Sequence, residues 1–302
     1  MRRAFLNRID KMIREEDDTV YFTVDIGMWA IRDILADFPE RAMNVGIYED
    51  GMFGIAAGLA AGGFVPTIFG IQPYLVERTL EQIKLDFAYQ KLGVNVVGTG
   101  AAVDYSKYGY SHYCAEDAGI LKMIPEVEVV TPGTAAEFLS LFNQTYRNGH
   151  STFFRISDHP NQNYDIEVQF GKASVIQRGT RATVIAVSVM LDEVMKVCEG
   201  EDVTVLYYTT LAPFDGDTLK QAYCGGKILI CEPHFSGVLD HDILQAIGGG
   251  PVQISHVGFP KEIFRNYGSY QDKMDFYQIN SEQIKKELRK FLNEERLECT
   301  II

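Results

Sequence analysis

The sequence predicts an α/β protein made of two α/β domains, each with a mostly parallel sheet flanked by helices. Strand-type runs alternate with helix-type runs in both halves of the chain, which is typical of a parallel sheet covered on both faces. With 302 residues, 46% of them hydrophobic, the chain can bury two cores. A polar stretch containing Pro160 interrupts the pattern, so we expect domains at 1–160 and 171–302, joined by a linker at 161–170.

In the first half, helices are predicted where apolar residues recur at helical spacing, and strands where short runs alternate or are apolar throughout. The expected elements are a helix at 1–16, a strand at 20–26, a helix at 28–37, a strand at 44–48, a Gly/Ala helix from Glu49, a strand at 64–71, a helix at 75–91, a strand at 94–98, a loop at 99–113, a helix at 116–123, a strand at 127–130, a helix at 135–146 and a strand at 152–156. The loop at 99–113 is polar and aromatic, as are many loops that line sites at strand ends.

The same patterns predict a second α/β set after the linker. Its elements are a strand at 182–189, a helix at 191–198, a strand at 203–208, a helix at 215–222, a strand at 227–231, a helix at 239–247, a strand at 252–256 and a charged helix at 281–294.

Charge and composition narrow the partners and the compartment. A formal charge of −13 argues against nucleic acid and against an anionic membrane surface, because no basic block offsets the repulsion. The amino terminus lacks the apolar core of a secretory signal, and five cysteines without a CxxC pair suit reduced thiols rather than disulfides or zinc. The uncharged stretch 51–76 contains Gly62, Gly63 and Pro66, which favours a buried helix and strand over a membrane span. We expect a cytoplasmic protein.

The segment around Glu49 is organised like a site. Glu49 lies between a strand-type run and a Gly/Ala helix, where we expect its carboxylate to be partly desolvated. Gly54, Gly58 and Gly62 leave no side chain along one helix face, so another backbone, another subunit or a flat ligand can approach closely. The plain alternative is a helix-start carboxylate stabilised by free N–H groups and the helix dipole.

Several ordered motifs resemble those of one enzyme family. They are GIYEDGMFGIAAGLAAG at 46–62, YLVERTLEQI at 74–83, GYSH and ED at 109–117, IPEVEVVTP at 124–132 and, more weakly, LAPFD at 211–215 and EPHFSG at 232–237. The first four resemble the pyrimidine-binding domain of transketolase-like, thiamine diphosphate-dependent enzymes, and the last two resemble the transketolase carboxy-terminal domain. The resemblance covers residues 18–292 and implies those two domains in that order.

The resemblance implies catalytic roles for Glu49 and His112. Glu49 would bond the pyrimidine ring nitrogen of thiamine diphosphate and share a proton with it, which desolvation favours. His112 would position or protonate substrate oxygens; a loop histidine bonded to Glu116 is the alternative. The remaining cofactor residues implied are Asp25, Phe69, Tyr74, Leu75 and Arg78. A helix cap is the plain reading of Asp25, and core packing explains the aromatic and apolar members equally well.

The residues implied for substrate binding depart from those of sugar-phosphate transketolases. They are Tyr108, His112, Arg155 and Asp158. Tyr108 stands where those enzymes place an Asp, and Asp158 where they place a phosphate-binding Arg. A carboxylate there repels phosphate, although Arg155 or a residue of a partner subunit could compensate. These departures argue against the ordinary pentose-phosphate substrates.

The chain lacks the Gly-Asp-Gly and Asn motif that holds the metal and diphosphate in this family. We therefore expect no metal site here, and expect Mg²⁺ to be held mainly by an amino-terminal partner subunit. The hypothesis is the carboxy-terminal subunit of a split transketolase-like enzyme, assembled as a heterotetramer, that transfers a two-carbon ketol unit from a ketose-type donor to an aldehyde. The alternatives are a 2-oxo acid dehydrogenase β subunit, a deoxyxylulose phosphate synthase-like enzyme and a noncatalytic scaffold.

Overall fold

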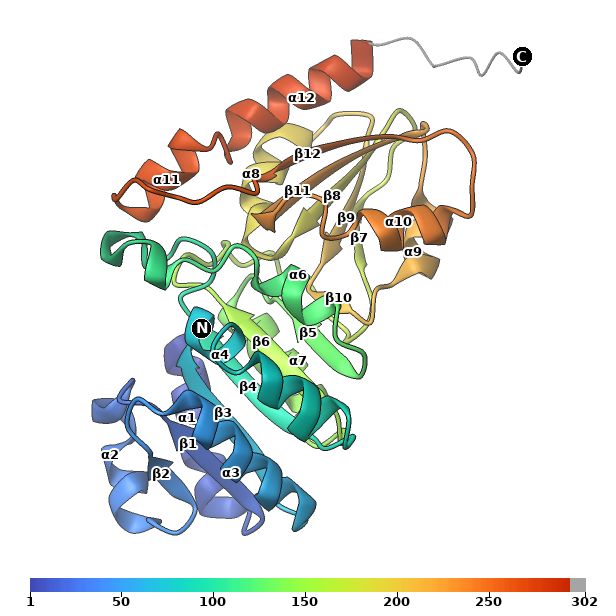
Figure 1. Ribbon diagram of the computed structural model, residues 1–302. Helices are drawn as coiled ribbons and strands as arrows, with labels where there is room; N and C mark the ends of the chain where they lie inside the picture. The colour runs from blue at the N-terminus through green and yellow to red at the C-terminus, as the bar shows by residue number, and fades with distance from the viewer. Residues whose placement is uncertain (294–302) are drawn as a thin grey trace.

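The computed structural model describes residues 1–293 and contains two sheets, one above the other in Figure 1. The first sheet has, in spatial order, β10 (Thr210–Ala212), β5 (Val127–Val130), β6 (Ser151–Ile156), β4 (Val94–Thr99), β3 (Val65–Ile71), β1 (Thr19–Thr23) and β2 (Ala42–Asn44). The second has β12 (Gln253–Phe259), β11 (Lys227–Phe235), β8 (Thr183–Val187), β9 (Thr204–Tyr208) and β7 (Ser174–Gln177). Only the edge strands β10 and β7 pair antiparallel in the part of the chain described, so the predicted fold class is confirmed.

Helices lie on both faces of each sheet. Those of the first half are α1 (Arg2–Glu15), α2 (Met28–Asp37), α3 (Glu49–Ala61), α4 (Gln72–Val76), α5 (Leu80–Gln82), a π-helical segment (Ile83–Ala88), α6 (Asp117–Lys122) and α7 (Ala135–Thr145). Those of the second half are α8 (Leu191–Cys198), α9 (Gly216–Ala222), α10 (Asp240–Ile247), α11 (Tyr270–Phe276) and α12 (Ser281–Asn293). Position 294, the end of the last predicted helix, lies outside the described residues.

Neighbouring residues of a central strand contribute to different cores, because side chains alternate between the faces of a sheet. In β1, Tyr21 belongs to the core that includes α1, α2 and α7, whereas Phe22 belongs to the core that includes α3. In β3, Phe69 and Ile68 divide in the same way. Both faces of the sheet are therefore covered, which explains why these strands do not alternate between apolar and polar residues.

Several predicted elements are wrong in their bounds. The strand expected at 20–26 ends at Thr23, and the strand expected at 227–231 continues to Phe235. The strand expected at 44–48 ends at Asn44, because the Asn44 side chain accepts a hydrogen bond from the Gly46 N–H and Gly46 has a φ of 72°. The helix expected at 75–91 is divided into α4, α5 and the π-helical segment. Thr79 interrupts it with a φ of −110°, and the Thr79 hydroxyl bonds the Leu75 carbonyl.

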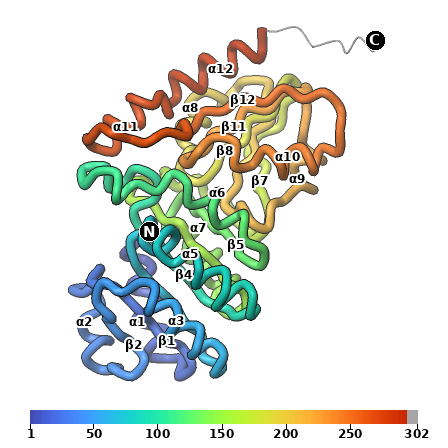
Figure 2. The backbone as a smooth tube through the Cα atoms, in the orientation of Figure 1, coloured from blue at the N-terminus to red at the C-terminus, as the bar shows by residue number. Residues whose placement is uncertain are grey.

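Two strands and one α-helix of the described chain have no counterpart in the prediction. They are β7, the three-residue β10 and α11, which lies above the loop at 99–113 in Figure 2. A capping box begins α11, where Ser269 and Asp272 each accept from the other's backbone N–H. Residues 157–173 contain no helix or strand, and β10 pairs with the first sheet. The division at 161–170 stays a prediction.

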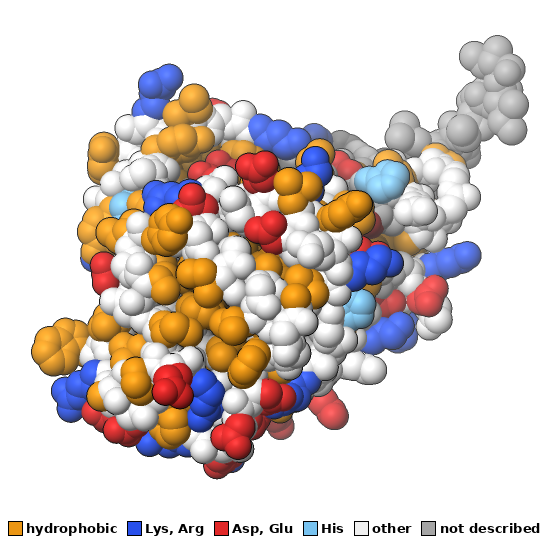
Figure 3. Space-filling model, turned by 60° about the horizontal axis from the view of Figure 1, so that its bottom comes forward, with side chains coloured by type: hydrophobic (Ala, Val, Ile, Leu, Met, Phe, Trp, Pro, Cys, Tyr) orange, Lys and Arg blue, Asp and Glu red, His pale blue; other side chains and the backbone are white. Residues whose placement is uncertain are grey.

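Exposed hydrophobic side chains occur on and beside α3, α5 and the π-helical segment, which contact one another. Figure 3 shows hydrophobic side chains spread over the face of the molecule that it presents. We call the surface on and beside these three helical segments the apolar face; its exposed members are Ile47, Tyr48, Ile55, Leu80, Leu85 and Tyr89. Beside them Gly58 has open space where a side chain would begin, and Gly54 meets only Asp86, at 4.0 Å. Among residues 1–293, no helix has the length and apolarity needed to cross a membrane.

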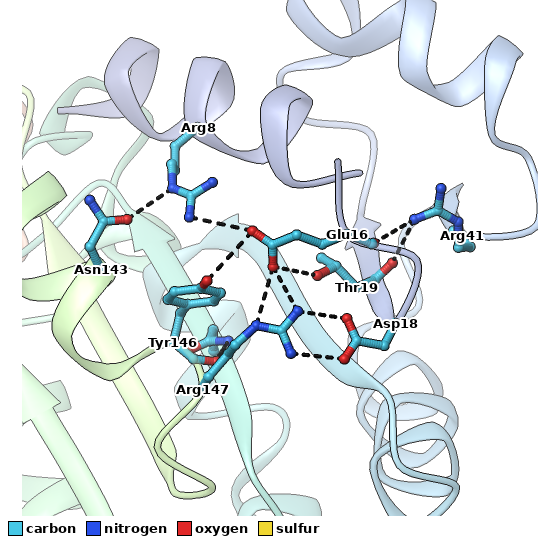
Figure 4. Close-up of polar contacts among 9 residues, drawn as sticks. Arg8, Glu16, Asp18, Thr19, Arg41, Asn143, Tyr146 and Arg147 are labelled. Carbon is cyan, nitrogen blue, oxygen red and sulfur yellow. Dashed lines mark hydrogen bonds and ion pairs between the residues drawn. The ribbon is translucent and has the colours of Figure 1, made fainter. Parts of the chain in front are cut away.

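An ion-pair network ties α1 to α7 near the amino ends of the central strands (Figure 4). Arg147 bonds the Glu16 carboxylate at 2.7 Å and the Asp18 carboxylate at 2.6 and 2.8 Å. Arg8 joins Glu16 to Asn143 of α7. We call these residues the amino-edge network.

Candidate functional site

The residues implied for catalysis follow parallel strands of the first sheet. Asp25 follows β1, Glu49 follows β2, Tyr74 follows β3, His112 follows β4 and Asp158 follows β6. Because these strands run in one direction, their carboxyl ends form one edge of the sheet. Ligands of open α/β sheets bind at this edge.

Glu49 begins α3 and is 1% exposed. Arg78 Nη1 donates to Glu49 Oε2 at 2.6 Å, while the Arg78 side chain remains 43% exposed. No described residue bonds the second carboxylate oxygen. The expected desolvation is present, and one oxygen of a buried carboxylate is left for a ligand.

A continuous series of contacts links Glu49 to His112. Arg78 lies over the Tyr74 ring at 4.6 Å, and the Tyr74 hydroxyl lies 3.3 Å from His112 Nε2. His112 Nδ1 lies 3.1 Å from the Ser111 hydroxyl. Burial lowers the pKa of His112 below its usual value. Two side chains, Arg78 and Tyr74, thus lie between Glu49 and His112, and the catalytic roles of the latter two stay predictions. His112 contacts hydroxyls where the alternative expected a bond to Glu116.

Phe69 and Leu75 are fully buried. The ring centres of Phe69 and Phe5 of α1 lie 5.1 Å apart. Leu75 fills the space over Gly70, where an added Cβ would lie 2.8 Å from Leu75 Cδ2. Core packing is what the structure shows for these two side chains, and a stacking role for either stays a prediction. Tyr74, which is half-buried, is the aromatic residue that faces the site.

Asp25 adopts a φ of 54° at the end of β1 and is exposed. Its carboxylate accepts a hydrogen bond from Asn44 Nδ2 at 2.7 Å, and its N–H donates to Asn44 Oδ1 at 3.0 Å. Gly27 is the N-cap of α2, so the alternative reading of Asp25 as its helix cap is not what the structure shows. The aspartate instead borders an open groove.

The groove brings in two cations that the sequence analysis missed. Its lining residues are Arg2, Arg3, Leu6, Asn7, Asp25, Gly27, Met28, Trp29 and Ala30. Among residues 1–293, neither Arg2 nor Arg3 forms an ion pair; Arg2 lies over the Phe69 ring at 5.9 Å. Adjacent arginines in the first turn of the helix before β1 were the available signal.

Arg155 lies in a buried network, at 2% exposure. Its Nε donates to Asp117 Oδ2 at 2.6 Å, and its Nη2 donates to the Pro233 carbonyl at 2.8 Å. Gln72 of α4 donates to the same Asp117 oxygen at 2.9 Å. A substrate would reach this guanidinium only by breaking these bonds, so its binding role stays a prediction.

Asp158 is exposed after β6, and its N–H donates to Asp104 at 2.8 Å. Burial raises the pKa of the Asp104 carboxyl to about 7. Burial also lowers the pKa of the Met1 ammonium, which the nearby Asp158 carboxylate opposes. The carboxylate expected at this position is thus present and exposed, and its effect on phosphate binding stays a prediction.

Tyr108 lies against His112, with ring centres 5.1 Å apart, and is more than half exposed. Two acids, Glu77 and Glu116, also follow strands of this edge, β3 and β4. Burial and the Glu116 charge raise the pKa of Glu77 to about 7, and burial raises the pKa of Glu116. Cys114 donates to Glu77 at 3.7 Å. This edge thus combines hydroxyls, aromatic rings and uncompensated acids.

Residues 1–293 contain no group of three His, Cys, Asp or Glu side chains arranged to hold a metal ion. Asp215, the last residue of the LAPFD motif, caps α9 by accepting from the Thr218 N–H at 3.1 Å. Its acidity therefore has a structural use.

Residues 1–161 match the family described as transketolase, pyrimidine binding domain. An uncharacterized 33.6 kDa protein in the fasciation locus of Rhodococcoides fascians is 30% identical over 96% of this chain and 94% of its own length. A subunit of the apulose-4-phosphate transketolase of Phocaeicola vulgatus is 27% identical, over 88% and 92%. A solved structure described as a split gene transketolase, inactive beta4 tetramer, superposes with a TM-score of 0.85 at 23% identity, covering 98% of this chain and 99% of that one.

Proposed function

Because the chain belongs to the transketolase family, we propose that it is the carboxy-terminal subunit of a split enzyme that transfers a two-carbon ketol unit from a ketose-type donor to an aldehyde. An amino-terminal partner subunit would complete the site. Thiamine diphosphate, when bound, supplies the carbanion-stabilising chemistry that such a transfer needs.

The observation that carries this proposal is the buried Glu49 carboxylate with one oxygen unbonded by any described residue. A buried carboxyl with a free oxygen at this position can hydrogen-bond a pyrimidine ring nitrogen. Arg78, which is partly exposed, can keep its bond to Oε2 or turn away as the ligand enters. His112 would hold or protonate a substrate oxygen, with Tyr74 fixing its ring.

The apolar face supports a partner subunit. Six large hydrophobic side chains are exposed beside Gly54 and Gly58, and apolar surface of this kind is typical of interaction sites. The described residues offer no three-ligand metal group, so the partner would bring the Mg²⁺ and diphosphate ligands. The name of the structural relative describes its β4 tetramer as inactive, which fits a subunit that needs another chain.

The groove supports a substrate with an anionic end. Arg2 and Arg3 have no ion-pair partner within 1–293 and lie at the same sheet edge as His112. Guanidinium groups bind phosphate through paired N–H donors. The relative from Phocaeicola vulgatus is named for a phosphorylated ketose. A phosphorylated ketose is therefore the substrate class proposed. Asp158 stands where sugar-phosphate transketolases place a phosphate-binding Arg, and in this chain Arg2 and Arg3 would bind the phosphate instead.

The test uses the full chain, an amino-terminal transketolase subunit sought first in the adjacent reading frame, and the mixture of the two. Calorimetry measures thiamine diphosphate binding in the presence of Mg²⁺, and a coupled assay compares hydroxypyruvate with pyruvate as donor and glycolaldehyde as acceptor. Binding by the mixture alone, with transfer from hydroxypyruvate, is the expected result. Pyruvate as the preferred donor would point to the synthase or dehydrogenase alternatives, and no binding anywhere would point to a scaffold.

A further inference from the structure

The loop that carries His112 is held by the second half of the chain. Ser106 Oγ donates to the Gly268 carbonyl at 2.8 Å, and the Tyr113 hydroxyl lies 2.7 Å from the Asn266 carbonyl and 3.0 Å from that of Ser106. Ser106 and Tyr113 are buried. The two anchors lie on opposite sides of His112 in the sequence, so they fix both arms of the turn that presents its ring.

The holding segment is itself rigidly built. Lys273 is buried and bonds both the carbonyl and the side chain of Asn266, and its ammonium lies 4.9 Å from the centre of the Tyr113 ring. Phe264 also packs against Tyr113, with ring centres 5.8 Å apart. Lys273 thus bonds the same Asn266 carbonyl that receives the Tyr113 hydroxyl.

Contact at the turn is also close. Gly109 has a φ of 87°, and a Cβ there would lie 2.7 Å from the Tyr267 ring. Only a residue without a side chain allows Tyr267 to lie against the turn between Tyr108 and Tyr110. Within the first half, by comparison, the loop is tied by Asp104 to Ser157 and by the backbone bridge of Ala102 and Cys114. The bridge holds Cys114, two residues after His112, and the Tyr74 hydroxyl contacts the His112 ring. The bonds from the second half add anchors at Ser106 and Tyr113.

We propose that the segment 264–273, through Ser106 and Tyr113, is a positioning element for the reaction, which sets where His112 meets the substrate. We call this segment the loop clamp. The inference rests on the proposed function, in which His112 touches substrate. It gives the second domain a direct task at a site built by the first. A small displacement of a substrate-contacting group lowers rates far more than it lowers stability.

The main test is Tyr113→Phe in the full chain, matched by Tyr208→Phe. Tyr208 is equally buried, and its hydroxyl also bonds a backbone carbonyl, that of Asp215 at 2.9 Å, far from the loop. Both changes remove one hydroxyl and keep the ring. His112 is followed by NMR in histidine-labelled chain, with His112→Gln to assign its signal, so this readout needs neither partner nor substrate.

Because burial lowers the pKa of His112, a released loop should let that pKa rise toward its usual value. We expect this rise in Tyr113→Phe and not in Tyr208→Phe. In the complex with the partner, Tyr113→Phe should lower kcat for ketol transfer by ~10-fold and leave thiamine diphosphate affinity unchanged. In the His112→Gln background, the further effect of Tyr113→Phe should disappear.

Equal His112 titration in the two Tyr→Phe variants would overturn the loop clamp. So would a loss of kcat in Tyr113→Phe that persists undiminished without His112. Failure of the proposed function looks different: ketol transfer would be absent in the unmodified complex, and the His112 titration would then decide the clamp alone.

Discussion

The amino and carboxyl edges of the first sheet are formed by opposite ends of the same strands, and they differ in how their charged side chains are paired. At the amino edge, Arg147 satisfies Glu16 and Asp18 together, and Arg8 adds a further pair. At the carboxyl edge, Arg2 and Arg3 have no carboxylate partner in the described chain, and burial and the Glu116 charge make Glu77 costly to ionise. The comparison indicates that the chain pairs the charges of its amino edge internally, whereas charged groups at the carboxyl edge remain available to bind other molecules.

The strongest way to break this comparison is Glu49→Gln. A carboxamide keeps the shape of the side chain but cannot share a proton with a pyrimidine nitrogen, so kcat of the assembled enzyme should fall by ~10³-fold. Steady-state ketol transfer measures the loss. Glu137→Gln is the matched control, since Glu137 is also a buried acid in the first turn of a helix. Equal activity of the two variants would remove Glu49 from catalysis.

Arg155 sharpens the comparison, because it lies toward the carboxyl edge but is paired as fully as any residue at the amino edge. Arg155→Met leaves Asp117 as a buried charge without its cation and should lower the free energy of unfolding by ~3 kcal/mol. Thermal unfolding should occur roughly 10 °C lower. Adding Asp117→Leu should restore much of the loss. A variant with unchanged stability and weakened substrate binding would instead favour the substrate role predicted from sequence.

At the amino edge, Arg147→Met should affect stability and leave kcat unchanged. The Arg147 side chain is partly exposed, so we expect a loss of only ~1 kcal/mol. Arg147 lowers the pKa of Asp18 below its ordinary 3.8. A depressed carboxyl pKa stabilises the fold above that ordinary value and ceases to do so as the pH falls through the folded value. The difference in Tm between variant and parent should therefore shrink below pH 4, and a constant difference would contradict the ion pair.

The smallest effect is expected for Glu77→Gln at the carboxyl edge. Its folded pKa, about 7, lies above the ordinary 4.5, so the folded state binds the proton more tightly than the unfolded state. Stability should consequently fall as the pH rises from 4.5 to 7. Because Glu77 is partly exposed, removing the charge should raise the free energy of unfolding at pH 8 by less than ~1 kcal/mol, with no gain at pH 4. The Tm of the variant and of the parent should be measured at pH 4 and at pH 8. A higher Tm of the variant at both pH values would indicate that the amide packs better, independently of charge.

Sequence patterns were sufficient where the structure follows local rules. The continuous apolar strands, the Gly/Ala helix and its break after Ala61 come from periodicity and from Gly62-Gly63 alone. The patterns failed where long-range contacts decide. The three residues of β10 form a strand through their pairing with β5, which is distant in the sequence. Thr79 interrupts a predicted helix, and its hydroxyl bonds the Leu75 carbonyl.

For the site, the motifs supplied Glu49, Tyr74, Arg78 and His112, whose side chains form one series of contacts. They could not separate Leu75, which is core, from the half-buried Tyr74 beside it, because burial depends on what packs above each residue. The motifs did not identify Arg2 and Arg3, because their role depends on the position of the first turn of α1 in the folded structure. The loop clamp was missed for the same reason, since it joins residues more than 150 positions apart.

The three-residue strand β10 has a consequence for how the chain can be divided. It pairs Thr210 and Ala212 with Val130 and Val129 of β5, which would otherwise be the outermost strand of the first sheet. A fragment ending near residue 160 would leave an apolar strand with unpaired backbone groups, and exposed edges of that kind recruit other strands. Anyone expressing the first domain alone should therefore expect aggregation, and should find that supplying the second half in trans restores solubility.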